Sequence, residues 1–297
     1  MTTLASTITY PVPARRHPVA QFILHQPLGA GGLVFIVIMA LAAIFAPWVT
    51  PYDPLTVDYG GMLAAPSWQH WMGTDSFGRD VMTRVIYGAR TALAVGFLAS
   101  FIGSTGGAVI GVVSAYFGGK TDLLIQGVMD ILLSFPIIVL ALTVVAMLGQ
   151  NIVFGVDVNL IIAISIPMVP RVGRVVRASA LAIRELPYID AARAAGFTNT
   201  RIIFRHMVPN VVAPYLIMLT AYVAQAILSE ASLSFLGLGV TEPTASWGLM
   251  LSGAAADFYQ QAPWMIIAPG LAISLAVFAF NLFGDSLRDW LDPKIKI

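Results

Sequence analysis

Cysteine is absent from this 297-residue chain, and charged side chains are scarce. The lack of cysteine excludes disulfides, thiolate metal ligands and cysteine nucleophiles, but it does not indicate a cellular compartment. Charged residues make up 10% of the chain and hydrophobic residues 58%, whereas about 25% of the residues in a soluble domain are charged. This composition is typical of a membrane protein. The net charge of +1 gives no reason to expect nucleic acid as a ligand.

Motifs for catalysis or cofactor binding are also missing. The four histidines are scattered and include no pair at the spacing of metal ligands. Neither a nucleophile elbow nor a zinc-protease motif occurs. The nearest match to a phosphate-binding loop, SAYFGGKT at 114–121, has Ser114 where that loop requires its first glycine. We therefore expect no catalytic residue, no metal and no cofactor, and hence a protein that is not an enzyme.

Long apolar runs dominate the sequence. A helix needs roughly 20 mostly apolar residues to span a bilayer, and six stretches meet this requirement. They are residues 28–49, 91–117, 124–148, 158–178, 211–236 and 263–284. Arg15 and Arg16 also suggest a signal peptide, but the apolar run that follows is too long and no A-x-A site comes after it. We therefore expect an all-α membrane protein with six transmembrane helices.

The distribution of Lys and Arg predicts the orientation, because cytoplasmic loops are enriched in both. With the N-terminus in the cytoplasm, thirteen of the sixteen basic residues fall in cytoplasmic segments. The three outside are Arg79, Arg84 and Arg90. Both termini are therefore predicted to be cytoplasmic. The chain then divides into a cytoplasmic N-terminal segment (1–27), the first transmembrane helix (28–49), an extracytoplasmic segment (50–90), a five-helix core (91–285) containing a cytoplasmic loop (179–210), and a cytoplasmic tail (286–297).

Small residues form a ridge on the second predicted helix. Gly103, Gly107 and Gly111 recur at every fourth position and therefore share one face. This spacing lets helix backbones approach closely in lipid. We interpret the three glycines as a helix-packing surface; the alternative is that this face lines a transport path.

Carboxylates inside membrane helices usually have a function. Asp130, Glu230 and Asp285 all fall near the ends of predicted helices, where water is within reach. Capping or ion pairing accounts for such positions better than proton coupling does. A proton-driven carrier would place a carboxylate or histidine at mid-span, and none is found. The spans therefore offer no group for proton coupling, and any energy source must lie elsewhere in the protein or its partners.

The densest charge lies in one cytoplasmic stretch, IDAARAAGFTNTRIIFRHMVPN at residues 189–210. Residues 190–195 favour a short helix, Gly196 suits a left-handed helix stop, and Thr198 or Asn199 suits the cap of a second helix. That second helix, about residues 200–207, is predicted to end at Pro209.

Three interpretations of this stretch are open. A DNA-reading helix–turn–helix is disfavoured because both ends are tethered to membrane helices and the unit is too small to bury a core of its own. A plain connecting loop would normally be shorter and less structured. Apolar side chains among the basic ones favour a projection that inserts into a groove on a cytoplasmic partner.

The spacing within residues 189–210 resembles the EAA loop of permease subunits from binding-protein-dependent ABC importers. That family has the motif E-A-A-x3-G-x9-I-x-L-P. This chain has DAA at 190–192, glycine at 196 and HMVP at 206–209, so Asp, His and Val replace Glu, Ile and Leu. The form RHMVPN is similar to the variant common in the peptide/nickel branch.

Further segments extend the resemblance over nearly the whole chain, to the C-type subunits of dipeptide and oligopeptide permeases. They are APWVTPYDP (46–54), HWMGTDSFGRDVMTRVIYGART (70–91), DILLSFP (130–136), ASLSFLGLGV (231–240), SWGLML (246–251) and FNLFGDSLRDWLDP (280–293). Six such segments in order are far more specific than one.

This resemblance implies a type I ABC importer permease fold in the inner (plasma) membrane of a bacterium. The chain would pair with a homologous permease subunit, two ATP-binding subunits and an extracytoplasmic substrate-binding protein. Residues 189–210 would couple the ATPases to the membrane helices, with the second helix docking into one ATPase. The implied coupling residues are Asp190, Ala191, Ala192 and Gly196 for the shape of the loop, Arg201, Phe204 and Arg205 for the partner contact, and Pro209 for its end.

The same resemblance implies transport of dipeptides or oligopeptides, with glutathione, opines and nickel chelates as alternatives. A secondary transporter is the alternative from another class, but it predicts mid-membrane charge or an inverted repeat, and neither is evident. The extracytoplasmic segments 50–90 and 237–262 carry charged and aromatic residues. These serve either as contacts for the binding protein or partner chain, or as internal ion pairs and interfacial anchors.

Overall fold

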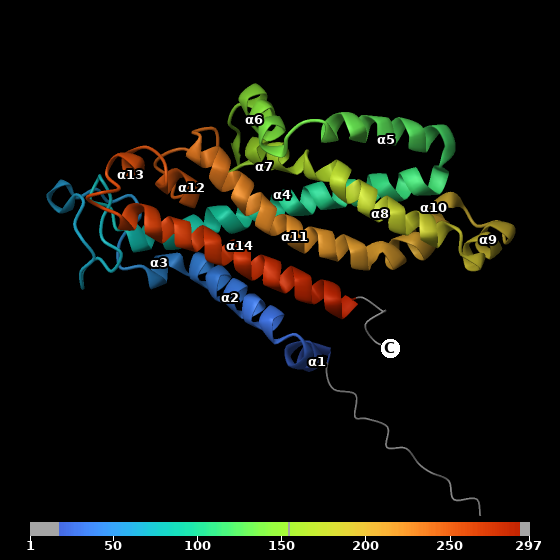
Figure 1. Cartoon of the computed structure of the whole chain (residues 1–297), viewed down its shortest axis with the longest axis horizontal. Coiled ribbons are helices and arrows are strands. Elements are labelled where there is room, and N and C mark those ends of the chain that lie inside the picture. The colour runs from blue at the N-terminus through green and yellow to red at the C-terminus, as the bar shows by residue number, and fades with distance from the viewer. Residues whose placement is uncertain (1–17, 154, 292–297) are drawn as a thin grey trace, which may run out of the picture.

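A computed structural model describes residues 18–153 and 155–291, which form an elongated bundle of helices (Figure 1). Most of the predicted segment 1–27 and half of the tail 286–297 lie outside the described residues. In chain order the elements are α1 (Pro18–His25), α2 (Pro27–Ile44), α3 (Ala46–Val49), the 3-10 turn η1 (Tyr59–Gly61), α4 (Val81–Phe117), α5 (Gly119–Leu133), α6 (Ile137–Leu148), β1 (Ile152–Val153), β2 (Val156–Asp157), α7 (Val158–Ser165), α8 (Met168–Arg184), α9 (Pro187–Ala194), α10 (Asn199–Ile202), the π-helical segment η2 (Ile203–Met207), α11 (Val208–Phe235), α12 (Trp247–Met250), α13 (Ala254–Asp257) and α14 (Trp264–Leu291).

Four stretches within the described residues are long and apolar enough to cross a membrane as single helices. They are α2, α4, α14 and the run Asn199–Phe235, which joins α10, η2 and α11. Two bent pairs also qualify: α5 with α6, at an angle of 92°, and α7 with α8, at 45°. If each bent pair is one span, the total is the six that the sequence predicts.

The third predicted span, 124–148, is not one straight helix. α5 ends at Leu133, and residues 134–136 turn the chain by 92° before α6 begins. Pro136 has no N–H to donate, and its ring would clash with the preceding turn of a continuing helix. As a result α5 lies along α8, whereas α6 packs on α7.

α4 is the central helix of the bundle, and it packs against α2, α8 and α11. Its first turn is capped by Asp80, whose carboxylate accepts a hydrogen bond from the Thr83 N–H at 2.7 Å. It ends at Gly118, which has a positive φ of 63°. The sequence predicted this helix as 91–117, so the last ten residues of the predicted extracytoplasmic segment 50–90 are helical.

The glycine ridge of α4 lies against the backbone of α7 and α8. A Cβ atom added to Gly103, Gly107 or Gly111 would lie 2.8, 2.6 or 2.5 Å from the carbonyl oxygen of Ser165, Val169 or Gly173, respectively. Such distances are shorter than any normal contact, so these positions accept glycine alone without a shift of one helix. The close approach increases dispersion contacts, which drive helix association in lipid.

The end of the bundle at which α4 and α14 begin is covered by extended segments (Figure 1). Residues 50–80 are fixed in place by long-range hydrogen bonds, such as Tyr52 Oη to the Gln69 carbonyl (2.9 Å) and Trp264 Nε1 to the Thr74 carbonyl (2.9 Å). The small antiparallel hairpin β1–β2 lies beside α7. Asp157 ends this hairpin and caps α7 by accepting from the N–H groups of Asn159 and Leu160.

Candidate functional site

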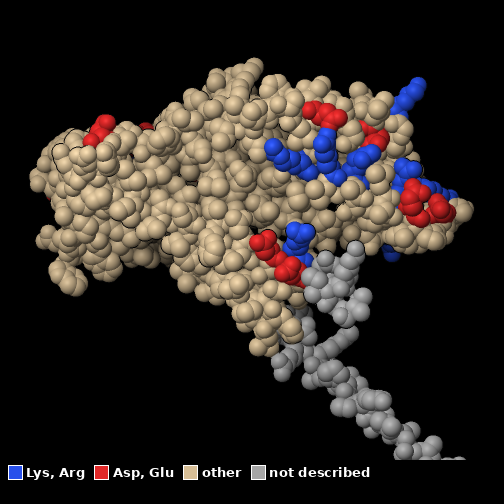
Figure 2. All heavy atoms as spheres, viewed as in Figure 1, with Lys and Arg blue, Asp and Glu red and all other residues tan. Residues whose placement is uncertain are grey.

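The charged stretch 189–210 lies at one end of the bundle, opposite the extended segments 50–80 (Figure 1). On the face shown in Figure 2, Lys, Arg, Asp and Glu gather towards the end that carries α8, α9 and α10, and the other end is almost free of charge. We refer to α9, the turn after it, α10 and η2 as the tip.

α9 presents one face to the bundle and one to solvent. Ile189 and Ala192, three residues apart, are 0% and 6% exposed and join the main apolar cluster. Asp190 and Ala191 lie on the exposed side, and the carboxylate of Asp190 pairs with Arg193 at 3.1 Å. The two alanines of the DAA sequence therefore differ: Ala192 holds the helix in place, and Ala191 is available at the surface.

Gly196 makes the turn after α9, as the sequence predicts. Its φ of 77° is in the left-handed region, which costs a residue with a Cβ about 1–2 kcal/mol. A Cβ at this position would meet no atom within 4 Å. The requirement for glycine is therefore conformational rather than steric. Hydrogen bonds from the N–H groups of Gly196 and Phe197 to carbonyls of α9 close the turn.

The prediction that a second short helix ends at Pro209 is wrong. Thr198 caps α10, its hydroxyl accepting from the Arg201 N–H at 3.4 Å, but the helix then continues through η2 into α11 without a break. In η2 the Val208 N–H donates to the carbonyl of Ile203, five residues back. This wider turn comes just before Pro209, which cannot donate the backbone hydrogen bond that a regular helical turn requires. The tip is thus rigidly joined to a membrane span.

Tyr116, near the end of α4, fastens the tip to the central helix. Its hydroxyl donates to Asn199 Oδ1 at 2.8 Å, and its ring lies 5.7 Å from the guanidinium of Arg193. Arg184 of α8 donates to the Ala115 carbonyl at 2.8 Å. Sequence reasoning missed these contacts because their partners are some 70 to 80 residues apart.

The remaining predicted coupling residues lie on the surface of the tip. The Arg201 guanidinium stacks on the Phe197 ring at 4.0 Å, and the same ring stacks on His206. Phe204 is 69% exposed, and Arg205 is exposed too. An exposed aromatic side chain beside basic ones is a feature of protein interfaces.

Ion pairs join α5 to α8 beside the tip. Arg177 donates twice to Asp122, at 2.7 and 2.5 Å, and Arg174 pairs with Asp130. The expected ion-pairing role of Asp130 is therefore present in the structure. Bidentate pairs of this kind fix the orientation of the two helices.

Glu230 is not near water, contrary to the sequence-based expectation. It is 0% exposed, and its Oε1 accepts from Ser234 (2.8 Å) and Ser246 (2.7 Å). The second contact ties the end of α11 to the residue before α12. Burial depends on the tertiary position of α11, which the depth along one helix does not reveal.

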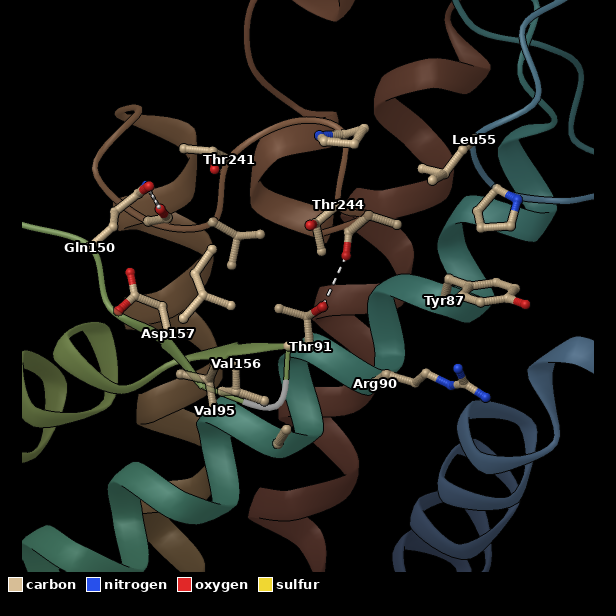
Figure 3. A pocket seen from close by; sticks show the side chains of 18 residues that line it. Leu55, Tyr87, Arg90, Thr91, Val95, Gln150, Val156, Asp157, Thr241 and Thr244 are labelled. Atoms are coloured by element: carbon tan, nitrogen blue, oxygen red, sulfur yellow. Dashed lines mark hydrogen bonds between the residues drawn. The ribbon is translucent and has the colours of Figure 1, made fainter.

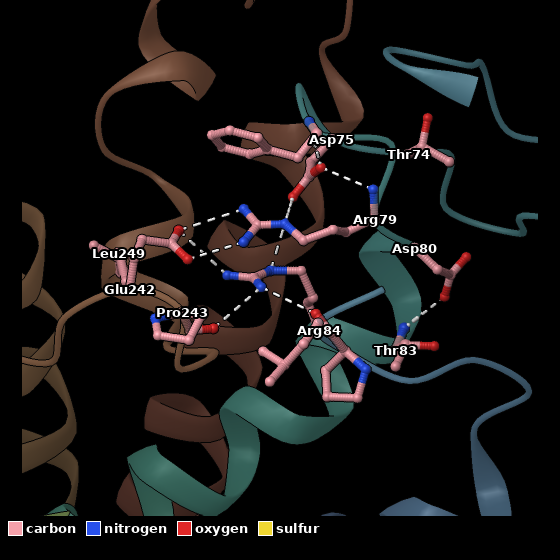
Figure 4. Close-up of polar contacts among 12 residues, drawn as sticks. Thr74, Asp75, Arg79, Asp80, Thr83, Arg84, Glu242, Pro243 and Leu249 are labelled. Carbon is pink, nitrogen blue, oxygen red and sulfur yellow. Dashed lines mark hydrogen bonds and ion pairs between the residues drawn. The ribbon is translucent and has the colours of Figure 1, made fainter. Parts of the chain in front are cut away.

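A cluster of two arginines and two carboxylates lies at the end of the bundle that residues 50–80 cover (Figure 4). Arg79 donates to Asp75 at 2.6 Å and to Glu242 at 2.9 Å, and Arg84 lies 3.5 Å from Glu242. Burial lowers the pKa of Arg79, but hydrogen bonds and charges from Glu242 and Asp75 outweigh it and raise the pKa above its ordinary value. Internal pairing of Asp with Arg was one of the two expectations for segment 50–90, and Asp75 with Arg79 is such a pair. The part played by Glu242 was not foreseen.

A cavity with a volume of about 480 Å³ lies near this cluster. Figure 3 shows it enclosed by the outer part of α4, the hairpin region and the loop after α11. Polar side chains at its wall include Thr91, Gln150, Asp157 and Thr244. The guanidinium of Arg90 points towards α2, where it binds the carbonyls of Ala43 and Ile44. The volume falls within the range of about 300–1,000 Å³ that small-molecule sites occupy.

Comparison with known families decides between the classes of membrane protein. The family described as "Binding-protein-dependent transport system inner membrane component" matches residues 107–297. The chain belongs to this family of inner-membrane transport permeases. "N-terminal TM domain of oligopeptide transport permease C" matches residues 19–66. These matches confirm the predicted family, a multi-pass protein of the inner membrane and a transport component rather than an enzyme.

Relatives of this permease cover most of its length. A dipeptide transport system permease protein of Alkalihalophilus pseudofirmus is 45% identical over 89% of this chain and 85% of its own. A putative peptide transport system permease protein of Brucella suis is 42% identical over 100% and 99%. A glutathione transport system permease protein of Escherichia coli is 43% identical over 91% and 88%.

Solved structures confirm the fold of the permease. The MetNI methionine ABC transporter in an inward-facing conformation has a chain that aligns with a TM-score of 0.54, at 18% identity. The alignment covers 71% of this permease and 98% of that chain. The predicted ABC importer permease fold is therefore correct.

Proposed function

We propose that this permease is one of two homologous membrane subunits of an importer for dipeptides or oligopeptides. The proposal that the complex is an importer is supported by the membership of this chain in the binding-protein-dependent transport family. The relatives named for dipeptides and peptides, at 45% and 42% identity over most of the chain, support the substrate. Two ATP-binding subunits would lie beneath the pair, and a binding protein would deliver the solute from outside.

The tip is the proposed point of contact with an ATP-binding subunit. Its exposed face combines Ala191 and Asp190 on α9 with Arg201, Phe204 and Arg205 beyond the turn. Its buried face, through Ile189 and Ala192, packs into the same apolar cluster as the membrane helices. Because η2 runs into α11 without a break, a force applied to the tip would reach a membrane span directly.

A pair of adjacent alanines gives the sharpest test of this contact. Ala191→Glu places charge on the exposed face, and we expect it to prevent co-purification of the ATP-binding subunit and to abolish uptake while the permease unfolds at the wild-type temperature. Ala192→Glu places charge in a site that is 6% exposed, so it should also lower the unfolding temperature. Ala256→Glu, exposed on α13 at the other end, is the matched control and should change neither. Retention of the ATPase and of uptake by Ala191→Glu would contradict the proposal.

Glutathione is the second candidate, because a glutathione permease is 43% identical over most of the chain. The complex reconstituted with its binding protein separates the two. We expect saturable uptake of labelled dialanine that unlabelled glutathione does not compete away. Uptake of labelled glutathione without uptake of dialanine would favour the second candidate.

A further inference from the structure

We propose that Arg79 and Arg84 form a carboxylate-binding site that Glu242 occupies in this structure, and that a carboxylate from outside the chain displaces Glu242 and releases the loop 237–246. The proposal rests on the proposed function only for the origin of that carboxylate, which is either the solute or an acidic side chain of the binding protein. The site itself is argued from the geometry in Figure 4.

The members of the cluster differ greatly in exposure. The side chains of Arg84 and Arg79 are 1% and 9% exposed, whereas that of Glu242 is 48% exposed. Two buried guanidinium groups are therefore neutralised in part by a carboxylate that solvent already reaches. Of the two carboxylates, Asp75 is 11% exposed, so Glu242 is the replaceable one.

The arginines have anchors that do not depend on Glu242. Arg79 Nε donates to Asp75 at 2.6 Å, and Arg84 donates to the Pro54 carbonyl at 3.2 Å. Without Glu242 they would keep their positions, and Asp75 alone would balance two positive charges. A buried pair of guanidinium groups with one uncompensated charge binds carboxylates strongly, because the planar fork makes two parallel hydrogen bonds.

Space for a second carboxylate lies beside the pair. A cavity of about 260 Å³ is lined by both arginines, Glu242, Ser76 and Ser252. A carboxylate entering from this side would meet the guanidinium groups that now face Glu242.

The loop that carries Glu242 is also a wall of the 480 Å³ cavity, to which Gly239, Thr241 and Ala245 contribute. Its ends are fixed, since the Val240 N–H donates to Ser234 Oγ at 3.0 Å and Thr91 Oγ1 donates to the Ala245 carbonyl at 3.0 Å. Its middle is fastened to the arginines by Glu242 and by the Pro243 carbonyl. Displacement of Glu242 breaks the shorter of these two contacts, because Arg79 donates to Glu242 at 2.9 Å whereas Arg84 lies 3.5 Å from the Pro243 carbonyl. The middle of this wall is then held only by the longer contact, and it loosens over the larger cavity.

A purely structural ion-pair network makes a different prediction, because added carboxylates would not change the position of the loop. The chain has no cysteine, so a single introduced thiol reports on opening. Ala245→Cys is suitable because Ala245 is 6% exposed and lines the larger cavity. Ala226→Cys, at a position that is 0% exposed in α11, is the matched control for general loosening.

The experiment measures the rate of maleimide labelling in the complete complex of both permease subunits and the ATPases in nanodiscs. We expect N-acetylglycine, but not N-acetylglycinamide, to accelerate labelling of Ala245→Cys by about tenfold, the factor that corresponds to ~1.4 kcal/mol in the opening equilibrium. When Glu242→Gln is combined with Ala245→Cys in one chain, we expect maleimide labelling at the fast rate without any added carboxylate. Ala226→Cys should stay slow throughout.

One further measurement identifies the source of the carboxylate: the labelling rate after the binding protein is added without peptide. Acceleration by the binding protein alone assigns the site to its acidic side chains; acceleration by N-acetylglycine without an effect of the binding protein assigns it to the solute. No acceleration in either arm, or equal acceleration of Ala226→Cys, overturns the proposal. Failure of dialanine uptake by the wild-type complex would reject the proposed function and leave the N-acetylglycine result unaffected.

Discussion

Two adjacent glycines on α4 test how closely the central helix must approach α8. A Cβ at Gly107 would lie 2.6 Å from the Val169 carbonyl oxygen and 2.8 Å from Val172 Cβ. A Cβ at Gly106 would meet only Val169 Cγ2, at 3.7 Å, which is an ordinary contact. Gly107→Ala should therefore force the two helices apart, and Gly106→Ala should not.

The magnitude follows from two opposing terms. Alanine in place of glycine favours a helix by about 1 kcal/mol, and this term is the same at both positions. Overpacking against atoms that cannot move separately costs about 1–3 kcal/mol, and it applies to Gly107 alone. We expect Gly106→Ala to be neutral or stabilising, with Gly107→Ala less stable than Gly106→Ala by about 1–3 kcal/mol.

The assay is the free energy of unfolding, measured by titration of SDS into the purified permease in mixed micelles. Comparison of the two variants removes the helix-propensity term, and the wild type gives the reference. Equal free energies for Gly106→Ala and Gly107→Ala would refute the reasoning, because the helices would then have room for a Cβ at the ridge. Loss of uptake by Gly107→Ala alone would further connect the α4–α8 spacing to transport.

Two further predictions concern the ends of single helices. Gly196→Ala should destabilise the tip by about 1–2 kcal/mol, because φ is 77°; Gly196→Asn should cost less, since asparagine tolerates this region, and equal thermal stability of wild type and Gly196→Ala would contradict the conformational argument. Asp157→Ala should cost about 1–2 kcal/mol by removing the cap of α7, while Asp157→Asn should keep most of it. Faster hydrogen exchange at Asn159 and Leu160 in the alanine variant is the measurement, and unchanged exchange would show that the cap contributes nothing.

The prolines show that a local sequence pattern does not determine where a helix bends. Pro136 accompanies a 92° break, whereas Pro214 and Pro269 lie inside the continuous helices α11 and α14. Pro209 was predicted to stop a helix and instead follows a π-helical turn in a helix that continues. The presence of a proline therefore does not by itself determine whether the chain bends at that position.

Among the charged residues, too, some contacts can be predicted from the sequence and others cannot. Asp75 and Arg79 are four residues apart, so their pairing was open to prediction from the sequence. Glu242 is 163 residues from Arg79, and no periodicity or spacing connects them. Glu230, judged by its place along one helix, was expected near water, and the fold buries it completely.

Sequence alone therefore determined the features that depend on neighbouring residues. Apolar runs long enough for a bilayer predicted the membrane spans, and the DAA-to-glycine spacing at 190–196 predicted the turn of the tip. The orientation inferred from the bias of basic residues towards one side stays a prediction. Tertiary structure alone decided which elements meet: the backbone of α8 on the glycine ridge, Tyr116 on the tip, and Glu242 on two buried arginines. The physical reason is that hydropathy and turn chemistry act within a few residues, whereas close packing and ion pairing join residues that only the folded chain brings together.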